Sequence, residues 1–158
     1  MFEKILVGYD GSPGAKAALD GAAALAKQFG AAITALFVRG PLPGYSDLPG
    51  EFEGEAEAAD EEFAKRQAEV ADFAARQGLA IRCEVCMGHP AKAIVQRADK
   101  DGYDLIVIGH SGHSELWGRL LGDTAHRVSD HAHCSVLVIK SGESPLPTSS
   151  KDEPAHSV

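Results

Sequence analysis

The stretch KILVGYDGSPGAKAALDGAAALAKQFGAAITALFV, residues 4–38, holds two apolar runs separated by an alanine-rich segment. The runs KILVGYD (4–10) and AAITALFV (31–38) have the length and composition of buried strands. The segment between them repeats alanine and leucine at helical spacing, and a glycine follows it. Ser12 and Pro13 suit the N-cap and the first position of that helix. The stretch therefore predicts a strand, a helix and a second strand, the unit from which parallel sheets are built.

The rest of the chain continues this alternation. Further strands are expected at LAIRCEVCM (79–87), YDLIVIGH (103–110) and CSVLVIK (134–140), and helices at about 55–77, 91–101 and 123–131. Five apolar strands alternating with four helices predict an α/β fold. The expected architecture is a Rossmann-like open five-stranded parallel sheet with helices on both faces.

Length and composition predict a single domain over residues 1–141. A chain of 158 residues is long enough to form a stable core without disulfides or structural metal ions. Residues 39–50 hold three prolines and three glycines and are expected to form a loop. Residues 142–158 are polar and rich in proline and serine, so a disordered C-terminal tail is expected there.

The net charge of -8 argues against partners that carry many phosphates, so neither a nucleic acid nor a membrane is expected to bind. No apolar run approaches the roughly 20 residues that span a bilayer. The start MFEKILVGYD lacks the basic region and long apolar core of a signal peptide. Three cysteines, an odd number, favour free thiols in a reducing compartment, so a cytoplasmic location is expected.

The stretch VIGHSGHSELWGRLLGDTAH, residues 107–126, suggests a cradle for phosphate. Gly109 and Gly112 follow an apolar strand, and Gly122 precedes a helix. Backbone amides at glycines can approach an anion closely, and the free amides of a helix start favour negative charge. Parallel strands end at one edge of a sheet, so Asp10, Val38 and Gly109 are expected to share a crevice there.

The chain resembles the universal stress protein family over residues 1 to about 140. The resemblance rests on KILVGYDGSPGAKAAL, on GHPAKAI, and on YDLIVIGHSGHSELWGRLLGDTAHRVSDHAHCSVLVIK. Nucleotide-binding members carry a glycine, two residues, a glycine, nine residues and a glycine, followed by serine or threonine. The resemblance implies an ATP-binding stress-response protein, with Mg²⁺ as a candidate companion ion. The residues implied to contact the nucleotide are Asp10, Val38, Ile108, Gly109, Gly112, Gly122, Asp123 and Thr124.

Asp123 stands where the family pattern has serine or threonine. An ionised carboxylate accepts hydrogen bonds but donates none. Beside a phosphate about 4 Å away it would cost about 4 kcal/mol at an effective dielectric of 20. Rotation into solvent or a bridging Mg²⁺ would reduce that cost. Alternatively, Asp123 is itself the N-cap and occupies the helix amides in place of a phosphate.

Two further clusters have chemical potential but favour simpler interpretations. Cys83 and Cys86 form a CxxC on an expected strand, where positions three apart face opposite sides of the sheet. Two ordinary thiols are therefore favoured over a redox or zinc motif. The stretch before the last strand holds His126, His131, His133 and Cys134, and a solvated turn is favoured there over a metal site. A metal or redox sensor that uses the histidines and cysteines is a third hypothesis for the function. No metal site is expected.

The resemblance also bears on partners and catalysis. The last strand, Cys134 to Lys140, is expected at a sheet edge, and family members commonly dimerise through it, so a homodimer is implied. The sequence shows no nucleophile, base and orienting group at a spacing typical of a catalytic site. No catalytic residue is therefore expected, and any ATP hydrolysis would be slow. The alternative function is a dimeric interaction module that binds no ATP.

Overall fold

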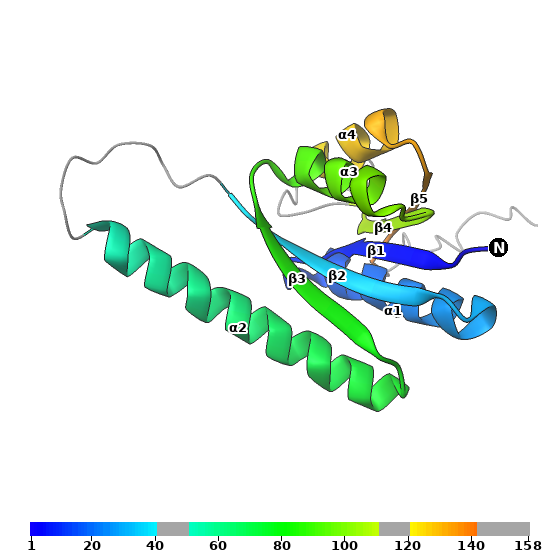
Figure 1. Ribbon diagram of the computed structural model, residues 1–158, viewed down its shortest axis with the longest axis horizontal. Coiled ribbons are helices and arrows are strands. Elements are labelled where there is room, and N and C mark those ends of the chain that lie inside the picture. The colour runs from blue at the N-terminus through cyan, green and yellow to red at the C-terminus, as the bar shows by residue number, and fades with distance from the viewer. Residues whose placement is uncertain (41–50, 111–120, 142–158) are drawn as a thin grey trace, which may run out of the picture.

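The computed structural model describes residues 1–40, 51–110 and 121–141. Five strands and four helices alternate along this part of the chain (Figure 1). The elements are β1 (Lys4–Gly8), α1 (Pro13–Phe29), β2 (Ala32–Arg39), α2 (Glu51–Gln77), β3 (Ile81–Met87), α3 (Pro90–Asp101), β4 (Leu105–Gly109), α4 (Asp123–His131) and β5 (Ser135–Ile139). The expected fold class is confirmed, and the predicted tail 142–158 lies outside the described residues.

The strands form one parallel sheet in the order β3-β2-β1-β4-β5. β1 is central and pairs with β2 on one side and β4 on the other, so Val7 lies between Ala35 and Val107. The chain therefore winds outward from β1 in both directions. β3 and β5 are the two edges of the sheet, as was expected for β5.

Helices cover both faces of the sheet, α1 and α2 on one and α3 and α4 on the other (Figure 1). Alternate residues of β1 point to opposite faces, with Ile5 and Val7 in the core beneath α1 and Leu6 in the core beneath α3 and α4. All three side chains are fully buried. This two-sided burial explains why the central strands β1 and β4 are continuous apolar runs, whereas the edge strand β3 carries Arg82 and Glu84.

β3 and β4 each start two residues later than the apolar runs suggested, because helix ends extend into those runs. Gly78 adopts a left-handed conformation, and the amide of Leu79 donates to Ala74 at 3.0 Å. Gly102 and Tyr103 repeat this arrangement at the end of α3, where the Tyr103 amide donates to Ala98 at 2.9 Å. These bonds satisfy the last helix carbonyls, so β3 and β4 begin only after them.

α2 begins at Glu51, four residues before the predicted start. Glutamates at the beginning of this segment favour a helix start, because their charge complements the positive end of the helix dipole. In Figure 1 the first turns of α2 extend beyond the carboxyl ends of β2 and β3.

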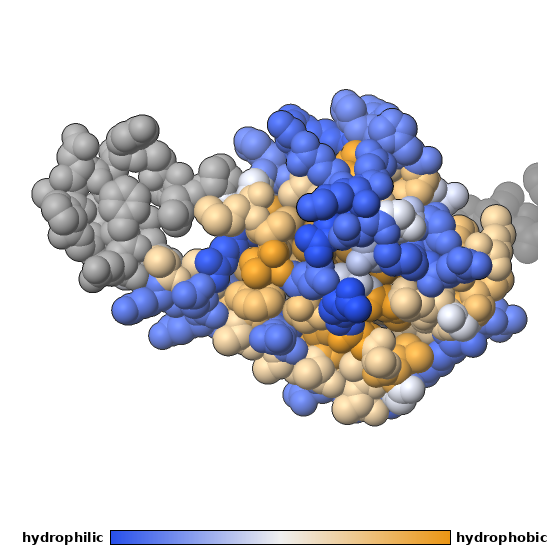
Figure 2. Space-filling view, viewed as in Figure 1, coloured by the Kyte–Doolittle hydropathy of each residue, from blue (hydrophilic) through white to orange (hydrophobic). Residues whose placement is uncertain are grey.

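The surface differs over the two layers. Hydrophilic residues cover α3 and α4, whereas apolar residues reach the surface over β3 (Figure 2). On that strand Val85 is 38% exposed and Met87 is 63% exposed. No helix in the described part of the chain is long and apolar enough to cross a membrane.

One polar pair is sealed inside the core. The Tyr103 hydroxyl donates to Thr34 Oγ1 at 2.9 Å, and both residues are buried. Tyr103→Phe leaves the Thr34 hydroxyl without this partner, and we expect a loss of about 1–2 kcal/mol in the free energy of unfolding, measured by urea denaturation. The double variant Tyr103→Phe, Thr34→Val removes both polar groups and should be more stable than the sum of the two single changes allows. Strict additivity would contradict a direct bond between the two hydroxyls.

Candidate functional site

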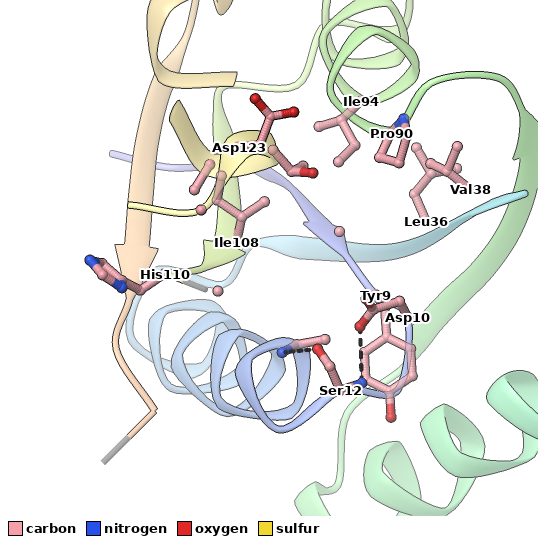
Figure 3. Close-up of a pocket in the computed structure, with 16 residues that line it drawn as sticks. Tyr9, Asp10, Ser12, Leu36, Val38, Pro90, Ile94, Ile108, His110 and Asp123 are labelled. Carbon is pink, nitrogen blue, oxygen red and sulfur yellow. Dashed lines mark hydrogen bonds between the residues drawn. The ribbon is translucent and has the colours of Figure 1, made fainter. Parts of the chain in front are cut away.

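A pocket of about 430 Å³ opens beyond the carboxyl ends of β1, β2 and β4 (Figure 3). Its walls come from the turn between β1 and α1, the end of β2, the end of β4, and the first turns of α3 and α4. The order of the strands reverses between β1 and β4, and open α/β sheets bind ligands at this point. The volume falls in the range of about 300–1,000 Å³ that is usual for small-molecule sites.

The turn after β1 is held by its own side chains. Asp10 Oδ1 accepts a hydrogen bond from the Ser12 amide at 2.9 Å, and Ser12 Oγ accepts from the Ala15 amide at 3.2 Å (Figure 3). Ser12 is therefore the N-cap of α1, as predicted, and Pro13 is its first residue. Asp10 therefore both stabilises the turn and lines the pocket, as expected from its place at the end of a strand.

Gly109 permits a close approach between β4 and α1. A Cβ atom at this position would lie 2.7 Å from the Gly14 carbonyl carbon and 2.8 Å from its oxygen. These atoms belong to the backbone of α1, so they cannot move aside as a flexible side chain would. The sequence analysis explained Gly109 by the approach of a phosphate. The packing of α1 against β4 also requires a residue without a side chain at this position.

A hydrogen bond closes the segment between β4 and α4. The Gly122 amide donates to the His110 carbonyl at 2.7 Å, and the His110 amide donates to the Ile139 carbonyl of β5 at 2.8 Å. Residues 110 and 122 therefore lie side by side at the pocket, although eleven residues separate them in the chain. Gly112, the middle glycine of the motif, lies between them and outside the described residues.

Asp123 is not the N-cap of α4, so that alternative is wrong. The N-cap is Gly122, and no described side chain accepts a hydrogen bond from the first turn of the helix. Asp123 is the first residue of α4 instead, and its Oδ1 lies 3.1 Å from Arg127 Nε one turn later. The Asp123 side chain is 79% exposed. The carboxylate is thus directed along the helix surface, where water and an arginine screen its charge.

The electrostatics of the pocket result from two opposing contributions. Asp10 and Asp123 are the only acidic residues in the described lining, which contains neither lysine nor arginine. Against them, α1, α3 and α4 all begin at the pocket wall. Each helix start carries a partial positive charge from the helix dipole. α1 and α3 begin with prolines, which have no N–H, and the Ala15 amide is already bonded to Ser12, so the start of α4 offers the most free amides. An anion would therefore be held by backbone amides rather than by cationic side chains of the described lining.

A partly buried polar network lies behind the β1–α1 turn. The Tyr9 hydroxyl donates to Glu69 Oε2 at 2.9 Å, and Arg66 Nη1 donates to Glu69 Oε1 at 2.8 Å. Burial and the neighbouring Glu69 carboxylate raise the pKa of Tyr9 above its usual range. Burial alone would raise the pKa of Glu69, but hydrogen bonds from Arg66 and Tyr9 outweigh it and hold this pKa below its ordinary value. Glu69 is thus held as a carboxylate.

Most of the residues singled out in the sequence line this one pocket. They are Asp10, Val38, Ile108, Gly109, Gly122, Asp123 and Thr124, and His110 joins them. The remaining candidate, Gly112, lies outside the described residues. Sequence reasoning missed Tyr9, Ser12, Leu36, Pro90 and Ile94 as lining residues. Their only signal was their place beside a strand end or a helix start.

The cysteines and histidines form no metal centre in the described chain. Cys83 packs in the core beneath α1 and Cys86 in the opposite core, so the expectation that they face opposite sides is confirmed. Burial raises the pKa of the Cys83, Cys86 and Cys134 thiols, which lowers their thiolate fraction. The described residues contain no group of three His, Cys, Asp or Glu side chains that could hold an ion.

Together, the fold and the pocket define a doubly wound α/β protein with a ligand-sized crevice at the point where its strand order reverses. Comparison with known proteins gives a more specific assignment. A family model described as the universal stress protein family matches residues 1–140. The chain belongs to the universal stress protein family.

Individual relatives support this assignment along the chain. Universal stress protein MJ0531 of Methanocaldococcus jannaschii is 37% identical over 142 residues, which cover 89% of this chain and 83% of that protein. The solved universal stress protein UspA from Lactobacillus plantarum has a TM-score of 0.76 at 29% identity, over 87% of this chain and 97% of its own. A universal stress protein solved in complex with cAMP has a TM-score of 0.67 at 28% identity, over 87% and 97%.

The contact at Gly109 yields a stability prediction. We expect Gly109→Ala to lower the free energy of unfolding by about 1–3 kcal/mol, because the added methyl group overlaps the backbone at Gly14. The matched control is Gly54→Ala in α2, where nothing lies within 4 Å of the new Cβ. That change should be neutral or stabilise by up to about 1 kcal/mol, since alanine favours helix. Urea denaturation of both variants, without ligand, measures the difference, and equal stabilities would contradict the close approach of α1.

Proposed function

We propose that this protein binds an adenine nucleotide in the pocket at the carboxyl ends of β1, β2 and β4, and that it acts as a stress-response regulator. The observation that carries the proposal is that three helix starts, together with Gly109 and Gly122, meet at one crevice. A relative of this chain was solved with cAMP, which supports a nucleotide as the ligand. ATP is the nucleotide implied by the resemblance to the nucleotide-binding members of the family.

The two ends of the proposed ligand find different surroundings. Leu36, Val38 and Ile94 give one side of the pocket an apolar lining that suits a planar base. Gly109, Gly122 and the start of α4 give the other side backbone amides that suit phosphates. Asp10, at the β1 end, is available to a hydrogen-bond donor of the base through the oxygen that does not bind Ser12.

The magnitude of the Asp123 penalty decides whether a phosphate is tolerated. Two unit charges about 4 Å apart repel by about 4 kcal/mol at an effective dielectric of 20, but by only about 1 kcal/mol in bulk water. Since the Asp123 side chain is 79% exposed and paired with Arg127, the lower value applies. Asp123 is then expected to weaken phosphate binding without abolishing it. A Mg²⁺ ion between Asp123 and the phosphates would reduce the penalty further.

The proposed role is binding rather than catalysis. Ser12 Oγ already accepts from the Ala15 amide, and no described lining residue combines a nucleophile with a base in hydrogen-bond reach. We expect ATP hydrolysis to be slow at most. The proposed location is the cytoplasm, and the proposed domain spans residues 1–141, with the tail 142–158 outside it.

Isothermal titration of the tag-free protein with ATP and AMP, with and without Mg²⁺, tests nucleotide binding. We expect Asp123→Ser to strengthen ATP binding about fivefold, the equivalent of about 1 kcal/mol, and AMP binding less, because ATP carries more charge. The gain should shrink when Mg²⁺ is present. Asp130→Ser is the control, since Asp130 lies on the same helix, is 59% exposed and is absent from the pocket lining. Failure of every form to bind at millimolar nucleotide would overturn the proposal.

The second candidate function is a dimeric interaction module that binds no ATP, favoured by the exposed edge at β5. Val136, Leu137, Val138 and Ile139 are each only partly buried there. The Ile139 carbonyl accepts from His110, so Val136 and Val138 turn their amides away from β4. These outward groups can pair with the same strand of a second copy, and we propose a homodimer on this surface for either function.

The edge strand gives a prediction on assembly. Val136→Pro removes an outward amide while leaving the bonds to β4 in place, and proline is tolerated at such edge positions. We expect the wild-type protein to sediment as a dimer and the variant to shift toward monomer, with an unchanged circular dichroism spectrum as the control for folding. A monomeric wild-type protein at high micromolar concentration would contradict the proposed dimer.

A further inference from the structure

Helix α2 is connected to the pocket wall by one polar network. Tyr9 lines the pocket, while its hydroxyl points toward α2 (Figure 3). Glu69 accepts from that hydroxyl at 2.9 Å and from Arg66 Nη1 at 2.8 Å. Two residues of α2 thus hold a residue of the pocket that lies about 60 positions earlier in the chain.

Arg66 also occupies the space beside the turn itself. Gly11 has a φ of +79°, and a Cβ there would lie 2.7 Å from Arg66 Nε and nearer still to the rest of the guanidinium. The guanidinium therefore packs directly on the backbone between Asp10 and Ser12. A side chain of α2 in this way supports the turn that presents Asp10 to the pocket.

The burial of Arg66 indicates more than a surface ion pair. Its side chain is only 16% exposed, and Nε is buried without a hydrogen-bond partner in the described structure. Glu62 Oε1 lies 3.6 Å from Nη2 on the more exposed side. A buried charge seldom stabilises a fold more than an apolar side chain of the same size would. Stability alone therefore explains this arginine poorly, whereas a requirement to fix the turn explains it well.

We propose that Arg66 is a positioning residue of the nucleotide pocket, which fills the space beside Gly11 and holds Tyr9 through Glu69, so that ligand binding and the docking of α2 are thermodynamically linked. The inference rests on the proposed nucleotide-binding function. A ligand that contacts the turn at Tyr9 and Asp10 favours the state in which α2 is docked. By reciprocity, docking of α2 strengthens ligand binding by the same factor by which the ligand favours docking, so a change that loosens α2 weakens ligand binding.

The test compares Arg66→Met with Arg76→Met, a matched change near the end of the same helix. Arg76 Nε donates a long hydrogen bond of 3.4 Å to the Asp72 carbonyl, and Arg76 is absent from the described pocket lining. We expect Arg66→Met to weaken AMP and ATP binding about tenfold in isothermal titration, within the usual range of coupling between sites. Arg66→Lys should restore part of the affinity, because it keeps the charge but not the planar fork. Arg76→Met should bind as the wild type does.

Hydrogen exchange separates positioning from a purely structural role. In wild type, AMP should slow exchange at α2 amides near Arg66, and in Arg66→Met this effect should be lost. A variant with a lower melting temperature but wild-type affinity and wild-type ligand protection would overturn the proposal. Glu69→Gln, which keeps the volume of the side chain, repeats the comparison if Arg66→Met fails to fold.

One measurement keeps this inference distinct from the proposed function. Without any ligand, the amides of Tyr9 and Ser12 are hydrogen bonded, to the Leu36 carbonyl and to Asp10. They should exchange faster in Arg66→Met than in Arg76→Met. Equal exchange would overturn the positioning role even if the wild type binds nucleotide. Faster exchange in a protein that binds no nucleotide would instead support the positioning role and reject the proposed ligand.

Discussion

The burial of β1 on all sides is the constraint on which the rest of the structure depends. Ile5, Leu6 and Val7 have no exposed surface, and the strand has a parallel neighbour on each side. Because crossovers between parallel strands are right-handed, the chain that leaves β1 toward β2 and the chain that arrives at β4 must pass on opposite faces. The helices therefore separate above the end of β1. The pocket is the opening that this separation leaves, so the site follows from the topology rather than from any one side chain.

The chemistry of the pocket results from a balance within the backbone. Its described lining has two carboxylates and no lysine or arginine, which by itself would repel a phosphate. Three helix starts counter this with oriented amides, and the Asp123 carboxylate is turned along its own helix toward Arg127. Family membership, by contrast, is a property of the whole chain over residues 1–140. Whether this pocket would tolerate a phosphate depends on the sum of these local charges, to which the residue at position 123 contributes directly.

Local patterns predicted most of the fold, because strands and helices are set by short-range periodicity. The N-cap at Ser12 followed from residue types at the helix start, and the opposite faces of Cys83 and Cys86 followed from their spacing. The edge position expected for the last strand was also confirmed. The N-cap role of Asp123 failed because Gly122 holds that position, one residue earlier than the sequence could resolve. The network of Tyr9, Glu69 and Arg66 was out of reach for another reason. It joins segments about 60 residues apart, and nothing within either segment indicates the other.

The contact between Gly109 and Gly14 changes what a glycine motif says about a relative. A side chain at position 109 would meet the backbone of α1 whether or not a ligand occupies the pocket. A family member that has lost its nucleotide would still need glycine there, because the sheet and the helix still have to meet. The first glycine of the motif thus indicates that β4 and α1 pack closely, and it does not indicate whether a nucleotide binds. Residues that line the pocket without packing in the core, such as the exposed Asp123, are the positions to compare when members are sorted into binders and non-binders.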